Sequence, residues 1–383
     1  METRIIKVSP SGGAGGGKGA GGRGELAAAL GPAVRAMRAG RLVVFPTETV
    51  YGVGVVATDA RAVERLRKLK ERPRAAFTVH IARPEDAFRY VKDPPVRARA
   101  LMAKAWPGPV TVLLPVGGRF ADPALRSKAL YRRMVQDDVV GLRCPADPVA
   151  QALLAAVGRP VLAASANLAG KSPPGNAAEA LEQLGGRVNV VIDAGRTRYR
   201  RASTIVAFEG EQYRLVRAGV YDAAAVERLV RRKVLFVCTG NTCRSPLAAA
   251  LARKLLAERM GLAVDELCDY GQEVVSAGVS AFAGGRATPE AVAAAERFGA
   301  SLEGHRSRKL TNELIKSADL IFCMTERHVA EVTRRVPSAA ARTFLLDAAG
   351  DIADPIGGDV ETYCQIAGRI VKALRRRMKE NLL

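Results

Sequence analysis

Short apolar segments alternate with helical patterns along almost the whole chain, and this alternation restricts the possible folds more than any other feature. The apolar run 42–45 predicts a strand, and the helical spacing of residues 60–70 predicts the helix that follows. The same order returns in the last third, where 234–237 predicts a strand and 247–260 a helix. Strands and helices that alternate in this way are typical of α/β proteins.

The length of the chain indicates two domains. Its 383 residues exceed the roughly 250 beyond which one hydrophobic core usually splits. A helical stretch that ends in a basic cluster precedes the strand at 234–237, and we expect the boundary there. The sequence therefore predicts a flexible Gly-rich segment at 1–24, a first domain at 25–220, a linker helix at 221–232, and a doubly wound parallel-sheet domain at 233–383.

Composition limits the location and the partners. No run of about eighteen apolar residues appears, so we expect a cytoplasmic protein without membrane contact. The six cysteines form no CxxC pair, which argues against a disulfide framework and against a metal site. A net charge of +21 favours anionic partners such as nucleotides, phosphoproteins or RNA. Because only 5% of residues are aromatic, a dedicated binder of single-stranded RNA is disfavoured.

The clearest chemical pattern is a strand, a short loop and a helix start between 233 and 260. Cys238 follows the strand, and Ser245-Pro246 suits the first turn of a helix. Loop amides and the positive end of a helix dipole together form a site for phosphate. The same field should lower the pKa of Cys238 and favour its nucleophilic thiolate. Arg244 can offer a planar fork to two phosphate oxygens.

The segment 237–246, V-C-T-G-N-T-C-R-S-P, resembles the active-site loop of the low-molecular-weight protein tyrosine phosphatases, and the similarity extends over 233–380. The resemblance implies that Cys238 attacks phosphorus, that Arg244 and the loop amides bind the phosphoryl group, and that Asp354 is the general acid. No cofactor is expected. Asp347, Asp351 and Asp359 are weaker candidates for the acid. The implied phosphate loop consists of Thr239, Gly240, Asn241, Thr242, Cys243 and Ser245, with Asn241 bracing it and Ser245 stabilising the thiolate.

Two features bear on the phosphatase substrate. Thr242 matches the bacterial protein-arginine phosphatases of this family, whereas tyrosine-specific members usually have an aliphatic residue there. The segment 354–358 resembles the arginine phosphatases too, except that Ile356 replaces an aromatic residue, and no Trp follows 276–278. We therefore expect a phosphorylated protein as substrate, with phosphoarginine preferred over phosphotyrosine. Alternatively, Thr242 only packs the loop. Cys243 either traps Cys238 as a reversible disulfide or is a small buried residue.

Polar residues of the first domain gather where strands end. Residues 45–54 place hydroxyls, a carboxylate and two glycines after an apolar strand, and 107–111 and 165–167 add further small polar groups. No set of Cys, His and Asp accompanies them. The composition indicates positioning and charge stabilisation of an anionic substrate, with Lys70, Arg72 and Arg143 facing it.

These fragments, in this order, resemble the threonylcarbamoyl-AMP synthases over 25–220, including Ser203-Thr204 and 215–219. The resemblance implies a twisted mixed sheet with helices, and the condensation of L-threonine, bicarbonate and ATP, with Mg²⁺, for threonylcarbamoyladenosine in tRNA. Other tRNA-modification proteins or RNA are possible partners. The implied threonine contacts are Thr47, His80 and Thr204, and the implied ATP contacts are Lys70, Arg72, Thr111, Arg143, Ser165, Asn167 and Arg217.

One stretch departs from that family's pattern. Residues 73–79 are one residue shorter than usual and lack the expected Lys or Asn midway. The sequence thus predicts a bifunctional fusion of synthase and phosphatase. The alternative is a nucleotide- or RNA-binding module of the same fold joined to a protein tyrosine phosphatase.

Overall fold

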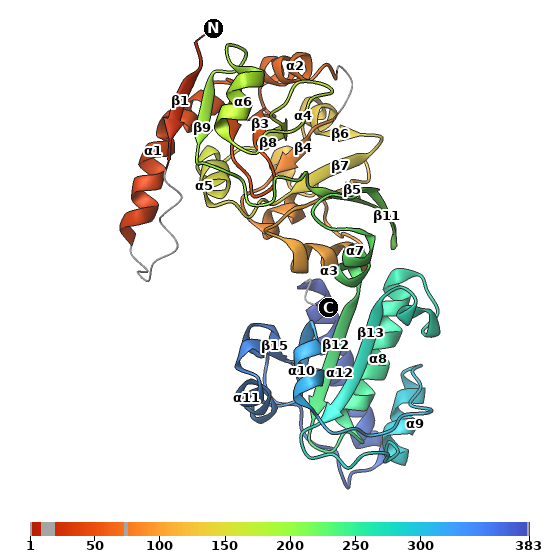
Figure 1. Cartoon of the computed structure of the whole chain (residues 1–383). Coiled ribbons are helices and arrows are strands. Elements are labelled where there is room, and N and C mark those ends of the chain that lie inside the picture. Colours follow the sequence, from red (N-terminus) through yellow and green to blue (C-terminus); the bar gives the residue numbers. More distant parts are fainter. Residues whose placement is uncertain (1, 9–19, 73–75, 381–382) are drawn as a thin grey trace. The chain divides into compact units, whose positions relative to one another are not determined.

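The chain divides into two compact units, Met1–Val230 and Arg231–Leu383. The computed structural model describes residues 2–8, 20–72, 76–380 and 383, as Figure 1 shows. Most of the expected flexible Gly-rich segment lies outside the described residues. At its two ends the expectation of a flexible segment is wrong, because 4–7 form a strand and 20–24 belong to a helix. The strand pairs with Val190–Asp193 along its whole length, which anchors the chain start to a sheet.

One mixed sheet organises the first unit. Its order is β1-β9-β2-β3-β8-β4-β7-β5-β10-β11, with β6 pairing with β7 at the side. Parallel pairs such as β5 with β10 and antiparallel pairs such as β5 with β7 occur together, which confirms the mixed sheet. The strands are β1 (Arg4–Lys7), β2 (Val43–Phe45), β3 (Gly52–Val56), β4 (Thr78–His80), β5 (Val110–Pro115), β6 (Val135–Gln136), β7 (Val139–Arg143), β8 (Val161–Ser165), β9 (Val190–Asp193), β10 (Thr204–Glu209) and β11 (Gln212–Arg217).

Helices cover this sheet over two separate cores. One core includes residues of α2, α3 and α7, and the other lies between α1, α5 and the β1-β9-β2 edge (Figure 1). The stretch expected to be a linker contains α7, which packs on α3 and buries Val226 and Val230 in the first core. Hydrophobic burial therefore holds α7 to the first unit. The helices are α1 (Ala20–Arg38), α2 (Ala60–Leu69), α3 (Val96–Ala105), α4 (Lys128–Met134), α5 (Pro148–Val157), α6 (Ala177–Leu184) and α7 (Ala223–Val230).

The second unit is a four-stranded parallel sheet with helices on both faces (Figure 1). Alternate residues of its central strand explain this arrangement. Val234 and Phe236 belong to the core with α8, α9 and α12, whereas Leu235 and Val237 belong to the core with α10 and α11. The elements are β12 (Arg232–Cys238), β13 (Gln272–Gly278), β14 (Leu320–Cys323), β15 (Thr343–Leu345), α8 (Arg244–Met260), α9 (Pro289–Arg297), α10 (Asn312–Ser317), α11 (Glu326–Arg335) and α12 (Val360–Lys379).

The strand order also predicts where a ligand binds. It runs β13-β12-β14-β15, so the chain leaves β12 toward one side and returns across it to the other. Ligands of doubly wound sheets bind outside the carboxyl ends of the strands at such a switch point. Cys238 is the last residue of β12 and therefore lies at that edge. Among the described helices of both units, none is long and apolar enough to cross a membrane.

Candidate active sites

The loop after β12 surrounds the sulfur of Cys238 with donors. Asn241 takes a left-handed conformation, with φ of 57°, and its amide donates to Cys238 Sγ at 3.2 Å. The Ser245 hydroxyl lies 2.9 Å from the same sulfur. Arg244 begins α8 immediately after the loop, so the positive end of this helix adds to the loop amides. The arrangement is an anion cradle with a thiol at its base.

Asn241 ties this loop to two neighbouring segments. Its side-chain amide donates to Ser245 Oγ and to Ser276 Oγ, both at 2.9 Å. Its side-chain oxygen accepts the backbone N–H of Arg308 at 2.9 Å, and its carbonyl oxygen lies 2.8 Å from His305 Nε2. Because Asn241 is fully buried, these hydrogen bonds hold the loop in one conformation.

Arg244 connects the loop to the expected acid. Its Nη1 donates to the carbonyl oxygen of Ile352 at 3.0 Å, and its Nη2 forms an ion pair with Asp354 Oδ2. The guanidinium is buried, whereas the side chain of Asp354 is 41% exposed. The structure therefore brings the predicted nucleophile loop and the predicted acid together.

The three weaker acids are engaged elsewhere. Asp347 pairs with Arg369, and Asp351 accepts the N–H of Glu326 at the start of α11. Asp359 caps α12 through the N–H of Thr362. Each of these carboxylates thus has a structural partner away from the cradle, and Asp354 is the one joined to Arg244.

The ionisation of Cys238 differs from the sequence prediction. Burial raises the pKa of the Cys238 thiol, although hydrogen bonds from Ser245 and Asn241 and the charge of Arg244 act in the opposite direction. The prediction of a lowered pKa is wrong for this arrangement. Cys238 is only 2% exposed, so the loss of hydration outweighs the contributions of Ser245, Asn241 and Arg244.

Two further loop residues have partners outside the cradle. Cys243 is a free, buried thiol whose sulfur lies 3.2 Å from the hydroxyl of Tyr363 on α12. The half-buried Thr242 has its hydroxyl 3.6 Å from the same sulfur. These contacts show Cys243 as a packed loop residue, and they leave its proposed redox role a prediction.

Sequence reasoning missed His328, which contacts the loop. Its Nε2 lies 3.0 Å from the hydroxyl of Thr239, and its Nδ1 lies 2.8 Å from the hydroxyl of Thr325. The available signal was positional. Thr325 and His328 follow strand β14, and the carboxyl ends of neighbouring parallel strands meet at one edge of the sheet.

In the first unit, the sheet register places the predicted residues in one row. His80 of β4 is opposite Arg143 of β7, and Arg143 is opposite Thr111 of β5. The row continues through Ile205 of β10 to Arg217 of β11. Directly opposed residues of neighbouring strands point to the same face of a sheet. Four distant segments of the sequence thus share one surface.

Arg143 is the most highly connected member of the row. Its Nη2 donates to Glu48 Oε1 at 3.0 Å, to Thr49 Oγ1 at 2.5 Å and to Thr47 Oγ1 at 3.3 Å. Its Nε is buried without a hydrogen-bond partner among the described residues. A buried guanidinium donor without a partner carries a desolvation cost.

Lys70 joins two other predicted residues. Its Nζ donates to the carbonyl oxygen of Ser165 at 2.9 Å and to Asn167 through the carbonyl at 2.5 Å and the side-chain oxygen at 3.1 Å. Burial, followed by the nearby charge of Arg72, lowers the pKa of Lys70 to about 8. Arg72 is exposed and also lowers the pKa of Arg217, so its charge reaches both cations.

A third cluster contains a residue that sequence reasoning quoted but did not select. Ser203 Oγ lies 3.1 Å from Thr111 Oγ1, and Arg217 Nη2 donates to the Ser203 carbonyl at 2.7 Å and to its hydroxyl at 3.1 Å. Ser203 therefore joins the row at its far end. The sequence signal for Ser203 was its position next to Thr204 in the Ser203-Thr204 pair.

Thr204 is placed differently from its predicted role. Its hydroxyl donates to the Tyr221 carbonyl at 2.9 Å and accepts the N–H groups of Tyr221 at 2.8 Å and Gly219 at 3.3 Å. The side chain is fully buried, and Thr204 is opposite Val110, on the core face of the sheet. A turn in the protein thus satisfies the hydroxyl, and the expected contact with L-threonine stays a prediction.

His80 is a neutral, buried member of the row. Its Nδ1 lies 3.2 Å from the Thr78 carbonyl oxygen, and its ring meets the Phe45 ring edge-on at 6.0 Å. Burial, followed by the charge of Arg143, lowers the pKa of His80 to about 3. The imidazole therefore serves as a neutral hydrogen-bonding group at physiological pH.

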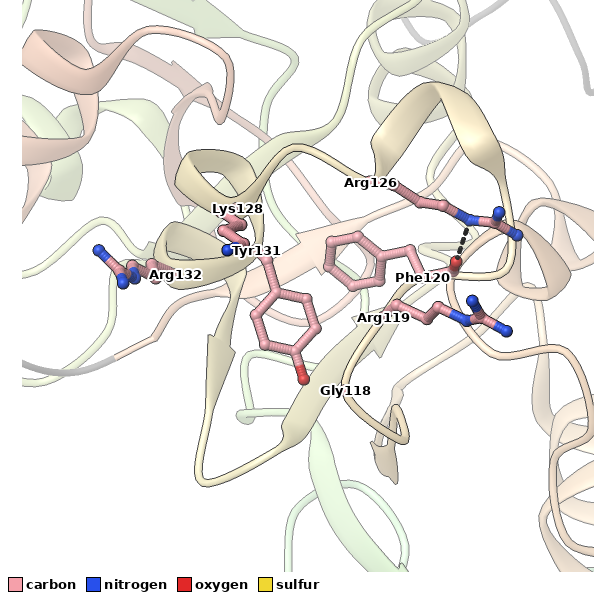
Figure 2. Close-up of a pocket in the computed structure, with 7 residues that line it drawn as sticks. All are labelled: Gly118, Arg119, Phe120, Arg126, Lys128, Tyr131 and Arg132. Carbon is pink, nitrogen blue, oxygen red and sulfur yellow. Dashed lines mark hydrogen bonds between the residues drawn. The ribbon is translucent and has the colours of Figure 1, made fainter.

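Two basic hollows of the first unit lie apart from this row. One, of about 110 Å³, is lined by Gly118, Arg119, Phe120, Arg126, Lys128, Tyr131 and Arg132 (Figure 2). The other, of about 430 Å³, is lined by Arg41, Leu42, Arg65, Lys68, Leu69, Arg187 and Asn189. Neither contains a residue predicted for the synthase site. Their exposed cations add to the positive surface expected from the composition.

Comparison with known proteins separates the two units in the same way. Residues 35–219 match the family model described as telomere recombination, and residues 233–382 match low molecular weight phosphotyrosine protein phosphatase. A threonylcarbamoyl-AMP synthase of Chromohalobacter salexigens is 35% identical over 182 residues, 47% of this chain and 93% of that protein. A protein-arginine-phosphatase of Bacillus subtilis is 40% identical over 152 residues, 38% of this chain and 95% of that protein. The chain belongs to both families.

The synthase family also includes longer proteins. A threonylcarbamoyl-AMP synthase of Pyrococcus abyssi is 35% identical over 196 residues, 51% of this chain and 55% of that protein. The chain thus spans about half the length of this relative. It joins a threonylcarbamoyl-AMP synthase domain to a low-molecular-weight phosphatase domain, which confirms the expected fusion.

Proposed function

We propose that the chain is a bifunctional enzyme that makes threonylcarbamoyl-AMP with its first unit and hydrolyses phosphorylated protein with its second. The relatives are named for these two activities. Both sets of substrates are cytoplasmic, and we place the protein there. One observation supports each half: the row from His80 to Arg217 in the first unit and the donor-lined Cys238 in the second.

In the synthase reaction, the row holds two substrates side by side. Thr47 and His80 at one end contact L-threonine, whereas Lys70, Arg72 and Arg217 bind the phosphates of ATP. The threonine amine attacks bicarbonate to give the carbamate, with loss of water. The carbamate oxygen then attacks the α-phosphorus of ATP and expels pyrophosphate. The positive charge of Arg143 offsets the negative charge that develops between the two substrates.

Magnesium fits this site as a companion of the nucleotide. The described residues contain no group of three or more His, Cys, Asp or Glu side chains that could hold a metal ion. Glu48, a carboxylate in contact with the row, is bonded to Arg143 and to the N–H of Ala146. Mg²⁺ commonly keeps most of its ligands from phosphates and water. We infer that the ATP phosphates hold the ion and that the cations of the row neutralise the rest of their charge.

Product formation from all three substrates tests the synthase. Pyrophosphate release should require L-threonine, ATP and bicarbonate together, and threonylcarbamoyl-AMP should appear in equal amount. Release of pyrophosphate without threonine, or binding of ATP without release of pyrophosphate, would overturn the synthase proposal. It would favour the alternative, a nucleotide- or RNA-binding module.

In the phosphatase reaction, Cys238 Sγ attacks phosphorus while the bond to the leaving group breaks. Asp354, once displaced from Arg244, takes up the proton that the Cys238 thiol loses and gives it to the leaving atom, and the phosphoryl group stays on sulfur as phosphocysteine. Water, deprotonated by Asp354, then attacks phosphorus and releases phosphate and the thiolate. An entering phosphoryl group competes with Asp354 for Arg244. We infer that this exchange supplies the thiolate with the cation that the ion pair withholds.

We further propose that phosphoarginine is preferred over phosphotyrosine. The half-buried Thr242 beside the cradle and the 70% exposed Ile356, two residues after Asp354, support this preference. A polar loop hydroxyl suits a guanidinium leaving group, and an aliphatic side chain can flank its planar face. Tyrosine phosphatase is the second candidate, since Phe282 is 91% exposed and could flank a phenyl ring.

A substrate comparison tests this half. The unchanged protein and Cys238→Ser should be assayed against phosphoarginine and phosphotyrosine peptides of one sequence. We expect a higher kcat/KM for phosphoarginine and no turnover by the variant. A clear preference for phosphotyrosine would overturn the arginine proposal alone, whereas activity that survives in Cys238→Ser would overturn the mechanism.

A further inference from the structure

A hydrogen-bonded chain of three side chains reaches the anion cradle from α11. Thr325 caps this helix, His328 follows one turn later, and Thr239 is the loop residue directly after the nucleophile. The imidazole lies between the two hydroxyls, 2.8 Å from Thr325 Oγ1 and 3.0 Å from Thr239 Oγ1. His328 is 3% exposed, whereas Thr239 is an exposed residue. The chain thus runs from a helix start to the solvent side of the cradle.

Two arrangements of the hydrogen atoms satisfy this chain, one for each tautomer of the imidazole. Thr325 Oγ1 accepts the backbone N–H of His328 at 3.4 Å, and in one arrangement its own proton goes to Nδ1 of the imidazole. Nε2 then carries the ring proton, and it donates to Thr239 Oγ1. The imidazole must be neutral for this pattern, and burial followed by the charge of Arg244 lowers the pKa of His328 to about 4.

The charged groups around His328 agree with a neutral ring. Arg244 and Arg327 lower its pKa, and Asp351 and Asp354 raise it by less than burial lowers it. A neutral imidazole has one donor and one acceptor nitrogen, so each tautomer gives the chain one direction. The tautomer protonated at Nε2 directs it from the Thr325 hydroxyl toward Thr239.

Thr239 has a second donor neighbour. Arg244 Nη2, which also contacts Asp354, lies 3.5 Å from Thr239 Oγ1. A hydroxyl has two acceptor sites and one proton. With His328 and Arg244 both donating to the oxygen, the proton of Thr239 is free to donate beside the guanidinium that faces the phosphoryl group.

We propose that Thr239 is a side-chain donor to the transferring phosphoryl group and that His328, held by Thr325, is the positioning residue that aims it. The proposal rests on the phosphatase assignment and adds to it a contact outside the loop amides and Arg244. A hydrogen bond to a charged oxygen is worth about 1.5 to 3 kcal/mol, equivalent to about a 10- to 100-fold change in affinity.

Phosphate binding and turnover together test this contact. Inorganic phosphate should be titrated into the unchanged protein, Thr239→Val and Thr239→Ser, with the affinity measured by calorimetry. We expect Thr239→Val to weaken binding at least tenfold and Thr239→Ser, which keeps the hydroxyl, to stay near the unchanged protein. Thr333→Val is the matched control, because the Thr333 hydroxyl bonds to the Val329 carbonyl of its own helix.

A double-mutant cycle tests the positioning role. His328→Leu alone should weaken phosphate binding and lower kcat/KM, and adding it to Thr239→Val should cause no further loss. His328→Gln, whose amide N–H can replace Nε2–H, should restore part of the loss. A purely structural histidine would give independent losses that multiply in the double variant.

The outcomes distinguish failure of the hydrogen-bonded chain from failure of the phosphatase assignment. If Thr239→Val binds phosphate as the unchanged protein does, or if the losses multiply, the hydrogen-bonded chain is overturned and the phosphatase stands. If the unchanged protein binds no phosphate, both are overturned. The circular dichroism spectrum of each variant should match that of Thr333→Val. A matching spectrum shows that weaker phosphate binding does not come from a folding defect.

Discussion

The two candidate active sites of this chain are assembled in opposite ways. In the second unit, the nucleophile, the amides and the arginine come from the single turn between β12 and α8. In the first unit, the corresponding donors come from strands β4, β7, β5 and β11, which the sheet register brings into one row. A local site depends on the geometry of one loop, whereas a distributed site exists only when the whole sheet has formed.

This contrast predicts different responses to substitution. A single change in the loop should abolish one activity and spare the other, and a change in the row should weaken binding in steps. The two units have separate cores, so damage to one need not reach the other. Each variant below is therefore measured for both activities in the same preparation.

The largest expected effect is that of Asp354→Asn on the phosphatase. Removal of a general acid lowers kcat by about 10²- to 10⁴-fold, and most for substrates with basic leaving groups. Synthase activity should not change. Asp351→Asn is the control, since Asp351 accepts the N–H of Glu326 rather than contacting Arg244. Equal losses in both variants would mean that the acid has been misassigned.

Arg143→Lys should lower the synthase kcat/KM by about 10²- to 10³-fold, because a lysine cannot replace the planar guanidinium that meets Glu48 and Thr49. Arg61→Lys, an exposed change on α2, provides the comparison. Pyrophosphate release and phosphatase turnover are the measurements. A loss shared by both activities would show that the units are not independent.

Asn241→Ala should destabilise the second unit by about 2 to 4 kcal/mol. It removes three buried hydrogen bonds and leaves an alanine in a left-handed conformation. Asn241→Gly loses the same hydrogen bonds, but glycine adopts a left-handed conformation without strain, so its effect should be smaller. Urea unfolding, monitored with one spectroscopic probe in each unit, measures the change in the free energy of unfolding. A change in the first unit's midpoint would contradict separate cores.

The smallest effect concerns acid stability of the first unit. Because the folded pKa of His80 is lowered to about 3, the unfolded chain binds more protons below the ordinary histidine range. Stability should be full above about pH 6.5 and fall by about 1 kcal/mol per pH unit down to about pH 3, where the folded histidine is protonated too. His80→Gln should flatten this dependence in urea titrations. An unchanged slope would assign the acid sensitivity to other groups.

The same contrast explains what the sequence could predict. The order of Cys238, Arg244 and Ser245 is visible because the loop is continuous, and the helix start can be recognised from Ser-Pro. Sequence could not show that Arg244 pairs with Asp354, because that contact spans more than a hundred residues. Nor could it show that burial outweighs the hydrogen bonds to the Cys238 sulfur. His328 was missed for the same reason, since only the strand order brings it to Thr239.

In the first unit, prediction of individual residues depended on resemblance to a family. The row from His80 to Arg217 requires the register of five strands, which no local pattern encodes. The neighbours Ser203 and Thr204 illustrate the limit of predicting individual residues from the sequence. Adjacent hydroxyls cannot be separated by residue type, and only the turn at Gly219 shows which one the backbone satisfies. A Cβ on Gly219 would lie 2.3 Å from the Ala202 carbonyl oxygen, so that turn needs glycine.

Identification of the phosphorylated atom tests the local site most directly. Asp354→Asn should be mixed with p-nitrophenyl phosphate, whose leaving group needs little protonation, then quenched in acid and analysed by peptide mass spectrometry. We expect a phosphoryl group on the peptide that contains Cys238, bound to its sulfur. A phosphoryl group on any other residue, or turnover with no covalent label, would contradict the cysteine mechanism.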